Sequence, residues 1–119
     1  MNNIEFYEDD KGYSETQDYI TNLSLKSDKS NRIKFEKIVD YLQALSEHGK
    51  SLGEPYIKKI DGDLWELRPL KDRFLFASWH DDKFVILHHF VKKTRKTPKK
   101  EIDQAKRNFK KLKDRSGLQ

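Results

Sequence analysis

Apolar residues recur at helical spacing in the first half of the sequence. Ser14 can cap a helix in which Ile20 and Leu23 lie one turn apart, and the polar segment 27–30 then interrupts the pattern. A longer helix should follow, because its apolar residues form one continuous face. This face consists of Phe35, Ile38, Leu42 and Leu45. Gly49 is a suitable terminator, since glycine readily adopts the backbone conformation found at helix ends.

From residue 56 the pattern changes to alternating positions and short apolar runs, which are typical of strands. Four such strands are predicted at residues 56–60, 64–68, 73–79 and 84–91, and a shorter one at Ile4–Phe6. The connections between the four are short, so consecutive strands should pair as antiparallel hairpins. The last run is apolar on both faces, which indicates a central strand that is covered on both sides.

A third helix is predicted near the C-terminus, with Thr97 as its N-cap and Pro98 at its first helical position. Its apolar positions are Ile102, Ala105, Phe109 and Leu112, and most of its other residues are Lys and Arg. The pattern predicts an α+β fold, in which two N-terminal helices pack on a curved, mainly antiparallel sheet of about five strands. The length and the lack of a long linker favour a single domain, residues 1–119.

The net charge of +5 is distributed unevenly along the chain. Residues 1–49 contain 6 Lys or Arg against 10 Asp or Glu, whereas residues 50–119 contain 19 against 10. Clustered cations attract phosphate at long range, so this division favours a polyanionic ligand for the C-terminal part. A solubilising surface would explain the composition equally well.

Several classes of chemistry find no support in the sequence. Cysteine is absent, which excludes disulfides and nucleophilic cysteine chemistry. No acidic or histidine set recurs at ligand spacing, and the adjacent His88 and His89 should point to opposite faces of their strand, so we expect neither a metal nor another cofactor. The apolar runs are far shorter than the ~20 residues that span a bilayer, and no signal peptide is recognisable. We therefore expect a soluble, cytoplasmic protein without a membrane partner.

One candidate site lies on the predicted strands 64–68 and 73–79. Strand alternation places Glu66 and Arg68 on the same face, and hairpin pairing should bring Arg73 close to Arg68. Two neighbouring guanidinium groups repel each other unless an anion lies between them, and a phosphate is well suited to bind both. A surface ladder of salt bridges neutralised by Glu66 is an equally good interpretation of these residues.

A second candidate region leads from the last strand into the basic helix. Residues 92–113 contain 11 Lys or Arg and only 2 Asp or Glu, a density that fits binding of an RNA backbone. The residues assigned to RNA binding are Lys58, Lys59, His88, Phe90, Lys92, Arg95 and Lys96. Tyr56 and Trp79 could stack on bases if they are exposed, although core packing is the better interpretation of each aromatic residue. His88 could assist proton transfer, but such a histidine is more often packed or hydrogen-bonded.

Two segments carry a more specific pattern. The first is GDLWELR at residues 62–68, followed by RFLF at 73–76, and the second is VILHHFVKKTRKTP at 85–98. In residue type, spacing and order of elements, they resemble the phage-derived, HigB-like branch of the RelE/ParE toxin superfamily over residues 52–110. The resemblance implies a RelE-like fold and the toxin of a type II toxin–antitoxin system. Such a toxin is a ribosome-dependent mRNA endoribonuclease that uses the ribose 2′-hydroxyl and arrests growth by inhibiting translation.

The resemblance also implies residue roles and partners. The expected catalytic residues are Glu66, Arg68, Arg73 and Lys93. The arginines would hold the phosphate, Lys93 would stabilise charge or act as an acid, and Glu66 would be the base or would orient an arginine. Several relatives place a tyrosine or histidine near the C-terminus as a base, but no tyrosine follows Tyr56 here, so the base is unassigned. The implied partners are mRNA, the ribosome and a HigA-like helix-turn-helix antitoxin, in a hetero-oligomer such as a dimer of heterodimers.

Two alternatives remain open at the level of sequence. A ParE-like protein-binding toxin would use the same scaffold without cutting RNA. A non-catalytic RNA-binding module would use the basic helix only to bind phosphate.

Overall fold

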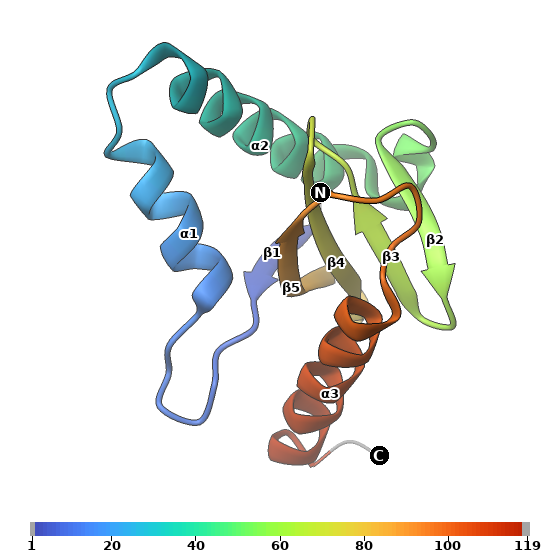
Figure 1. Ribbon diagram of the computed structural model, residues 1–119. Coiled ribbons are helices and arrows are strands. Elements are labelled where there is room, and N and C mark those ends of the chain that lie inside the picture. Colours follow the sequence, from blue (N-terminus) through green and yellow to red (C-terminus); the bar gives the residue numbers. More distant parts are fainter. Residues whose placement is uncertain (1, 118–119) are drawn as a thin grey trace.

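The computed structural model describes residues 2–117, in which three α-helices flank a five-stranded sheet (Figure 1). The helices are Glu15–Ser24 (α1), Lys29–His48 (α2) and Lys99–Arg115 (α3), and a short 3₁₀ helix, Gly49–Leu52 (η1), follows α2. The strands are Asn3–Phe6 (β1), Ile57–Asp61 (β2), Leu64–Leu67 (β3), Asp72–Trp79 (β4) and Lys83–Val91 (β5). The predicted α+β class and order of elements are confirmed. Within the described residues, no helix has both the length and the apolar character needed to cross a membrane.

The sheet has the strand order β1-β5-β4-β3-β2. The predicted antiparallel pairing of β2 with β3, β3 with β4 and β4 with β5 is confirmed. The N-terminal strand adds in parallel to β5, with Ile4 opposite Phe84, and this makes the sheet mixed. The sheet is uncurled, in place of the curved sheet expected. It is also open, since β1 and β2 are its two edge strands and do not pair with each other.

Strand alternation divides the apolar residues between two cores, one on each face of the sheet. The first core lies on the α1–α2 face and contains Leu23, Ile38, Leu45, Phe74, Phe76 and Ile86, each at most 5% exposed. The second lies under α3 and contains Leu75, Ala77, Val85, Leu87, Ala105 and Phe109. Strands β4 and β5 are therefore covered on both faces, which confirms the prediction made for the last apolar run, now β5.

Local signals at the helix ends are partly confirmed. The Ser14 side chain accepts a hydrogen bond from the Gln17 backbone at 3.1 Å, and α2 ends before Gly49, which has a φ of 58°. The predicted N-cap of α3 is wrong. Pro98 occupies the cap position in an extended conformation, with a ψ of 143°, so the helix begins one residue later and no side chain caps it. The Thr97 hydroxyl is instead directed at the sheet, where it donates to Glu66.

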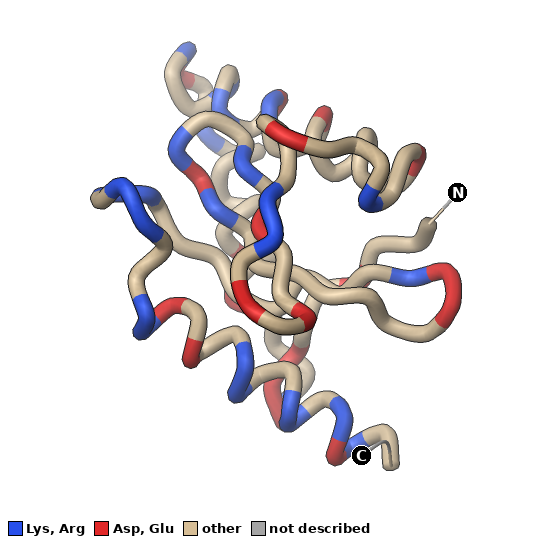
Figure 2. Tube along the Cα trace, turned by 90° about the vertical axis from the view of Figure 1, so that its right-hand side faces the viewer, with Lys and Arg blue, Asp and Glu red and all other residues tan. Residues whose placement is uncertain are grey.

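The cations of the C-terminal half follow α3 and the strands and segments near it, whereas α2 carries a smaller set of its own (Figure 2). Lys and Arg occur along α3 and in the segment 92–96 that leads into it (Figure 2). Lys58 and Lys59 are exposed on β2, the edge strand near this segment. The uneven charge of the sequence thus becomes a basic surface around the end of the sheet that carries β2 and β3.

Candidate functional site

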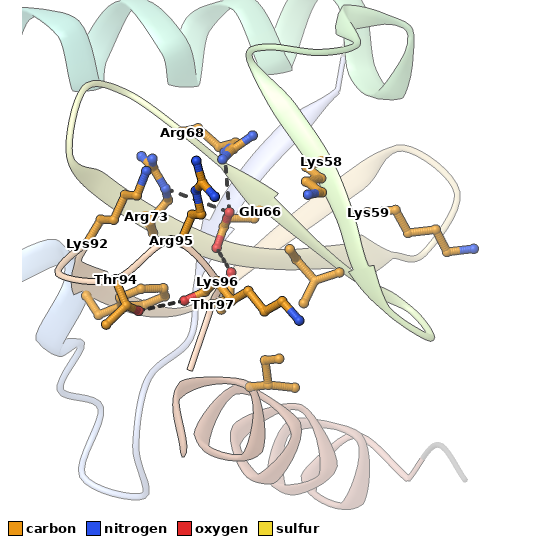
Figure 3. Close-up of a pocket in the computed structure, with 13 residues that line it drawn as sticks. Lys58, Lys59, Glu66, Arg68, Arg73, Lys92, Thr94, Arg95, Lys96 and Thr97 are labelled. Carbon is orange, nitrogen blue, oxygen red and sulfur yellow. Dashed lines mark hydrogen bonds and ion pairs between the residues drawn. The ribbon is translucent and has the colours of Figure 1, made fainter. Parts of the chain in front are cut away.

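Glu66 lies at the centre of a polar cluster on the α3 face of the sheet (Figure 3). It is only 2% exposed, although it carries a carboxylate. Its Oε1 atom lies 3.4 Å from Nε of Arg68 and 3.7 Å from Nε of Arg73. Its Oε2 atom accepts a hydrogen bond of 2.5 Å from the Thr97 hydroxyl. Both carboxylate oxygens are thus in contact with groups of the protein itself.

The pairing of β3 with β4 brings these residues together. Leu67 lies opposite Phe74, and the turn between the strands closes with a hydrogen bond from the Asp72 backbone to Pro69 at 3.0 Å. Arg68 and Arg73 therefore flank the turn and reach the same oxygen of Glu66. The predicted convergence of these three side chains is confirmed, including their common face of the sheet.

Arg73 is held firmly in this cluster. It is 6% exposed, and its Nη1 atom donates to the carbonyl oxygens of Leu70 at 2.8 Å and Asp72 at 2.9 Å. Burial lowers the pKa of Arg73, and the nearby charge of Arg68 lowers it further. The Glu66 carboxylate acts in the opposite direction and raises the pKa. An arginine remains protonated despite such a shift. Among residues 2–117, Nη2 has no hydrogen-bond partner, so its donors are not used by the protein itself.

The cluster forms the wall of a cleft of about 270 Å³. The cleft is lined by seven cations and one carboxylate, and its other lining residues are Ile60, Phe90, Thr94, Thr97 and Ile102. The cations are Lys58, Lys59, Arg68, Arg73, Lys92, Arg95 and Lys96. In the described part of the chain, none of these lysines nor Arg95 forms a salt bridge, and the buried Nε of Arg68 lacks a hydrogen-bond partner. This excess of unneutralised positive charge favours an anionic ligand with several phosphates.

Most of the residues predicted for RNA binding line the cleft, but two predicted site residues do not. Lys93 is exposed and faces a neighbouring groove. The Nε2 atom of His88 lies 2.8 Å from Glu101 of α3, and a bulge in β5 turns both Leu87 and His88 toward that helix. His88 lines a separate pocket beyond the cleft.

Of the aromatic residues considered for base stacking, only Phe90 lines the cleft. Phe90 lines the cleft and is partly exposed, so it can contact a ligand there. Trp79 is 8% exposed and packs edge-on against Phe109, which confirms the core interpretation. Tyr56 is 41% exposed but lies against Tyr41 near η1 and does not line the cleft.

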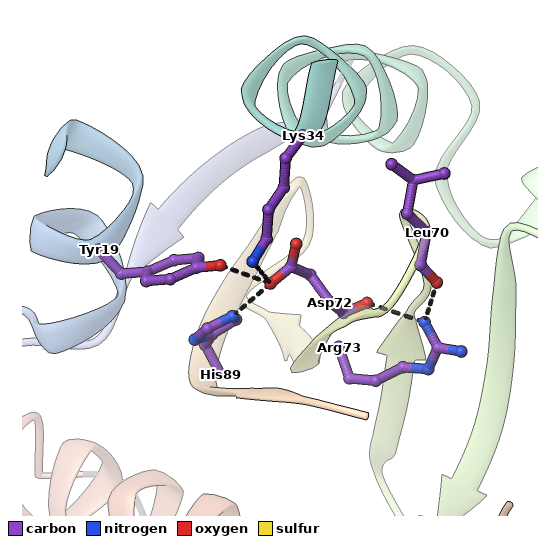
Figure 4. A network of polar contacts seen from close by, with 6 residues as sticks. All are labelled: Tyr19, Lys34, Leu70, Asp72, Arg73 and His89. Carbon is purple, nitrogen blue, oxygen red and sulfur yellow. Dashed lines mark hydrogen bonds and ion pairs between the residues drawn. The ribbon is translucent and has the colours of Figure 1, made fainter. Parts of the chain in front are cut away.

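A buried polar network, which was not predicted from the sequence, lies on the opposite face of β4 (Figure 4). Asp72 is fully buried, and its Oδ1 accepts hydrogen bonds from Tyr19 at 2.7 Å and His89 at 3.0 Å. The Lys34 ammonium lies 3.5 Å from the same oxygen. Burial by itself would raise the pKa of Asp72, but the hydrogen bonds from His89 and Tyr19 and the charge of Lys34 outweigh it and hold the pKa below its usual value.

Burial and the hydrogen bond to Asp72 raise the pKa of Tyr19, so its hydroxyl remains a donor. The Asp72 network therefore joins α1, α2, β4 and β5, directly behind Arg73. Strand alternation could have placed Asp72 and Arg73 on opposite faces, but the sequence had no signal for the three partners of Asp72.

The fold and the cleft define a small α+β protein with a basic cleft built around Glu66 and two arginines. Residues 24–110, which are 87 of the 119, match the family model described as Phage derived protein Gp49-like (DUF891). The chain therefore belongs to this family, which is related to the RelE/ParE-like toxins. No protein of curated function matches the sequence significantly.

Proposed function

We propose that this protein is a HigB-like toxin with a RelE-like arrangement, which cleaves mRNA on the ribosome. The observation that carries the proposal is the cleft, in which a buried carboxylate orients two arginines among seven cations. An ordinary surface ladder of salt bridges would neutralise its charges, whereas this cleft retains a large positive excess. Membership of a toxin-related family supports the same assignment.

In the proposed reaction, a ribose 2′-hydroxyl attacks the adjacent phosphorus. The bond from phosphorus to the 2′-oxygen forms as the bond from phosphorus to the 5′-oxygen breaks. The 2′-oxygen loses a proton, and the departing 5′-oxygen gains one. Nη2 of Arg73 and the guanidinium of Arg68 would hold the phosphate and stabilise the charge that develops on it. Preorganised donors of this kind each contribute about 10²–10³-fold in rate.

The contacts of Glu66 favour an orienting role over that of a base. Oε1 faces both arginines and Oε2 is occupied by Thr97, so the carboxylate fixes the direction of the two guanidinium groups. Lys92 and Lys96 line the cleft and are better placed than Lys93, which lines only the neighbouring groove, to neutralise charge at the reacting phosphate. Phe90 provides an apolar surface against which a base can stack.

The proposal includes the partners that such a toxin requires. We propose that a helix-turn-helix antitoxin of the HigA type neutralises the protein in a hetero-oligomer, such as a dimer of heterodimers, in the cytoplasm. Co-expression of the chain with the protein encoded beside it tests this part. Restored growth and co-purification are expected, and a neighbour that does neither would contradict it.

Cleavage of a translated message tests the function directly. In a translation extract, the wild-type chain should produce discrete RNA fragments, and Arg73→Ala should lose about 10²-fold or more in cleavage rate. Lys37→Ala removes an exposed charge on α2, away from the cleft residues, and should cleave normally. Thermal unfolding of each variant shows whether Arg73→Ala is folded.

Two other outcomes would favour the alternatives. Toxicity without RNA fragments would indicate a protein-binding toxin of the ParE type. Binding of RNA without fragments would indicate a non-catalytic module.

A further inference from the structure

A second groove adjoins the cleft and shares one of its walls. It has a volume of about 430 Å³ and lies between the β3–β4 turn and the segment that follows β5. Arg73, Lys92 and Arg95 line both the cleft and this groove. Lys71 and Lys93 line the groove but not the cleft. A strand of nucleic acid that leaves the cleft past Arg73 would therefore enter this groove.

The two walls of the groove are fixed to each other. The backbone of Lys92 donates to the carbonyl oxygen of Lys71 at 2.7 Å, directly beyond the pairing of Asp72 with Val91. The carbonyl oxygen of Leu70 accepts from Nη1 of Arg73 at 2.8 Å. The backbone on both sides is thus part of the hydrogen-bonded end of the sheet, so its cations are held near one another.

The charges of the groove are not balanced by acids. Five of its seven lining residues are Lys or Arg, and none of the seven carries a carboxylate. In the described residues, Lys71 and Lys93 form no salt bridge. Three of the six lysines of α3 differ, since Lys99, Lys106 and Lys110 each lie within 3 Å of a carboxylate, at 2.9, 2.6 and 2.9 Å. Like charges gathered without counter-charges repel, and this cost is removed when a polyanion binds.

We propose that the groove binds the RNA phosphate next to the one held in the cleft, on the same single strand. Lys71 and Lys93 contact this second phosphate, and Arg73 lies between the two phosphates. Leu70, which is 53% exposed at the rim, offers an apolar contact to the sugar or base between them. Lys93 thus contributes to substrate binding and not to the chemical step. This inference rests on the proposed function, because it assumes that the cleft binds RNA.

Short 2′-fluoro oligouridylates, which lack the 2′-hydroxyl nucleophile, test the proposal by titration at low salt. The dinucleotide has one bridging phosphate and the trinucleotide has two. The wild-type protein should bind the trinucleotide more tightly. In the Lys71→Ala/Lys93→Ala double variant, trinucleotide affinity should fall by ~10-fold while dinucleotide affinity is unchanged. On logarithmic scales, trinucleotide affinity falls linearly with salt concentration. The steepness of this fall should be smaller by ~0.7 for each phosphate that the variant no longer neutralises.

Lys37→Ala is the matched control, because it removes an exposed positive charge from α2. Both groove lysines are exposed, so the double variant should unfold at the wild-type temperature. Equal loss of affinity for both oligonucleotides, or no loss for either, would overturn the second site and leave the proposed function standing. Failure of the wild-type protein to bind any of the oligonucleotides would instead contradict the proposed function.

Discussion

Replacement of Asp72 by asparagine should destabilise the protein, although the two side chains have nearly the same shape. Oδ1 of Asp72 accepts from Tyr19 and His89 and lies 3.5 Å from the Lys34 ammonium. An uncharged acceptor would weaken each of two charge-assisted bonds by about 1 kcal/mol. Among the described residues the buried Oδ2 has no hydrogen-bond partner, so an amide nitrogen there would be an unsatisfied donor that costs about 1 kcal/mol more. The total is a loss of about 2–3 kcal/mol, or roughly 10 °C in the unfolding temperature.

The pH dependence separates the effect of charge from that of packing. The pKa of Asp72 is lowered in the folded state, so its carboxylate stabilises the fold fully above its ordinary pKa of about 3.9, and this contribution is lost as the pH falls through the folded value. The difference between wild type and Asp72→Asn should therefore be largest near neutral pH and shrink below about pH 4.

Urea denaturation at a series of pH values, monitored by circular dichroism, provides the measurement. Asp10→Asn is the control, because Asp10 is exposed in the loop after β1, and it should change the free energy of unfolding by less than about 0.5 kcal/mol. A stabilising role for the Asp72 charge is contradicted if Asp72→Asn is as stable as wild type at pH 7, or if the difference between them is the same at pH 3 as at pH 7.

Three further predictions concern the cleft and the core. Thr97→Val should remove the donor to the buried Glu66 and lower the free energy of unfolding by about 1–2 kcal/mol, while Thr97→Ser should restore it in the same denaturation assay. Arg73→Lys keeps the charge but replaces a planar fork, whose Nη1 binds two carbonyl groups while Nη2 is left for a phosphate, by a single ammonium, so RNA cleavage in extract should fall by about 10²-fold. Near-wild-type cleavage would show that the guanidinium geometry is not required. Ile38→Ala should lower the free energy of unfolding by about 2–5 kcal/mol because Ile38 is fully buried, whereas Ile33→Ala on the exposed side of α2 should lower it by less than about 1 kcal/mol. Equal decreases in urea denaturation would contradict the assignment of the core.

The helices and strands were predictable because their signals are local. Period and capping depend on residues within a few positions of one another, as at Ser14 and in the buried face that includes Ile38 and Leu45. The exception is the start of α3. A threonine before a proline is a reasonable N-cap from local chemistry alone, but the hydroxyl of Thr97 finds a stronger acceptor in Glu66, which is 31 residues away in the sequence.

The candidate site was predictable where a hairpin determines it. Glu66, Arg68 and Arg73 converge because one turn fixes the register of β3 and β4. Beyond Val91 strand alternation ends, so the directions of the side chains from Lys92 to Lys96 depend on how the segment crosses to α3. Lys93 was therefore assigned to the cleft because it is a lysine in a basic segment, and the direction of its side chain could not be predicted.

The sequence alone determined the α+β class, the order of the elements, the three central residues of the cleft and the excess of positive charge. Three other features depend on long-range packing: β1 joins β5 in parallel, Asp72 contacts Tyr19 of α1 across 53 positions, and His88 contacts Glu101 of α3 instead of lining the cleft. The physical reason is that periodicity and turn chemistry act between near neighbours. Contacts between distant residues depend instead on how complete faces of helices and sheet pack, which no short stretch of sequence encodes.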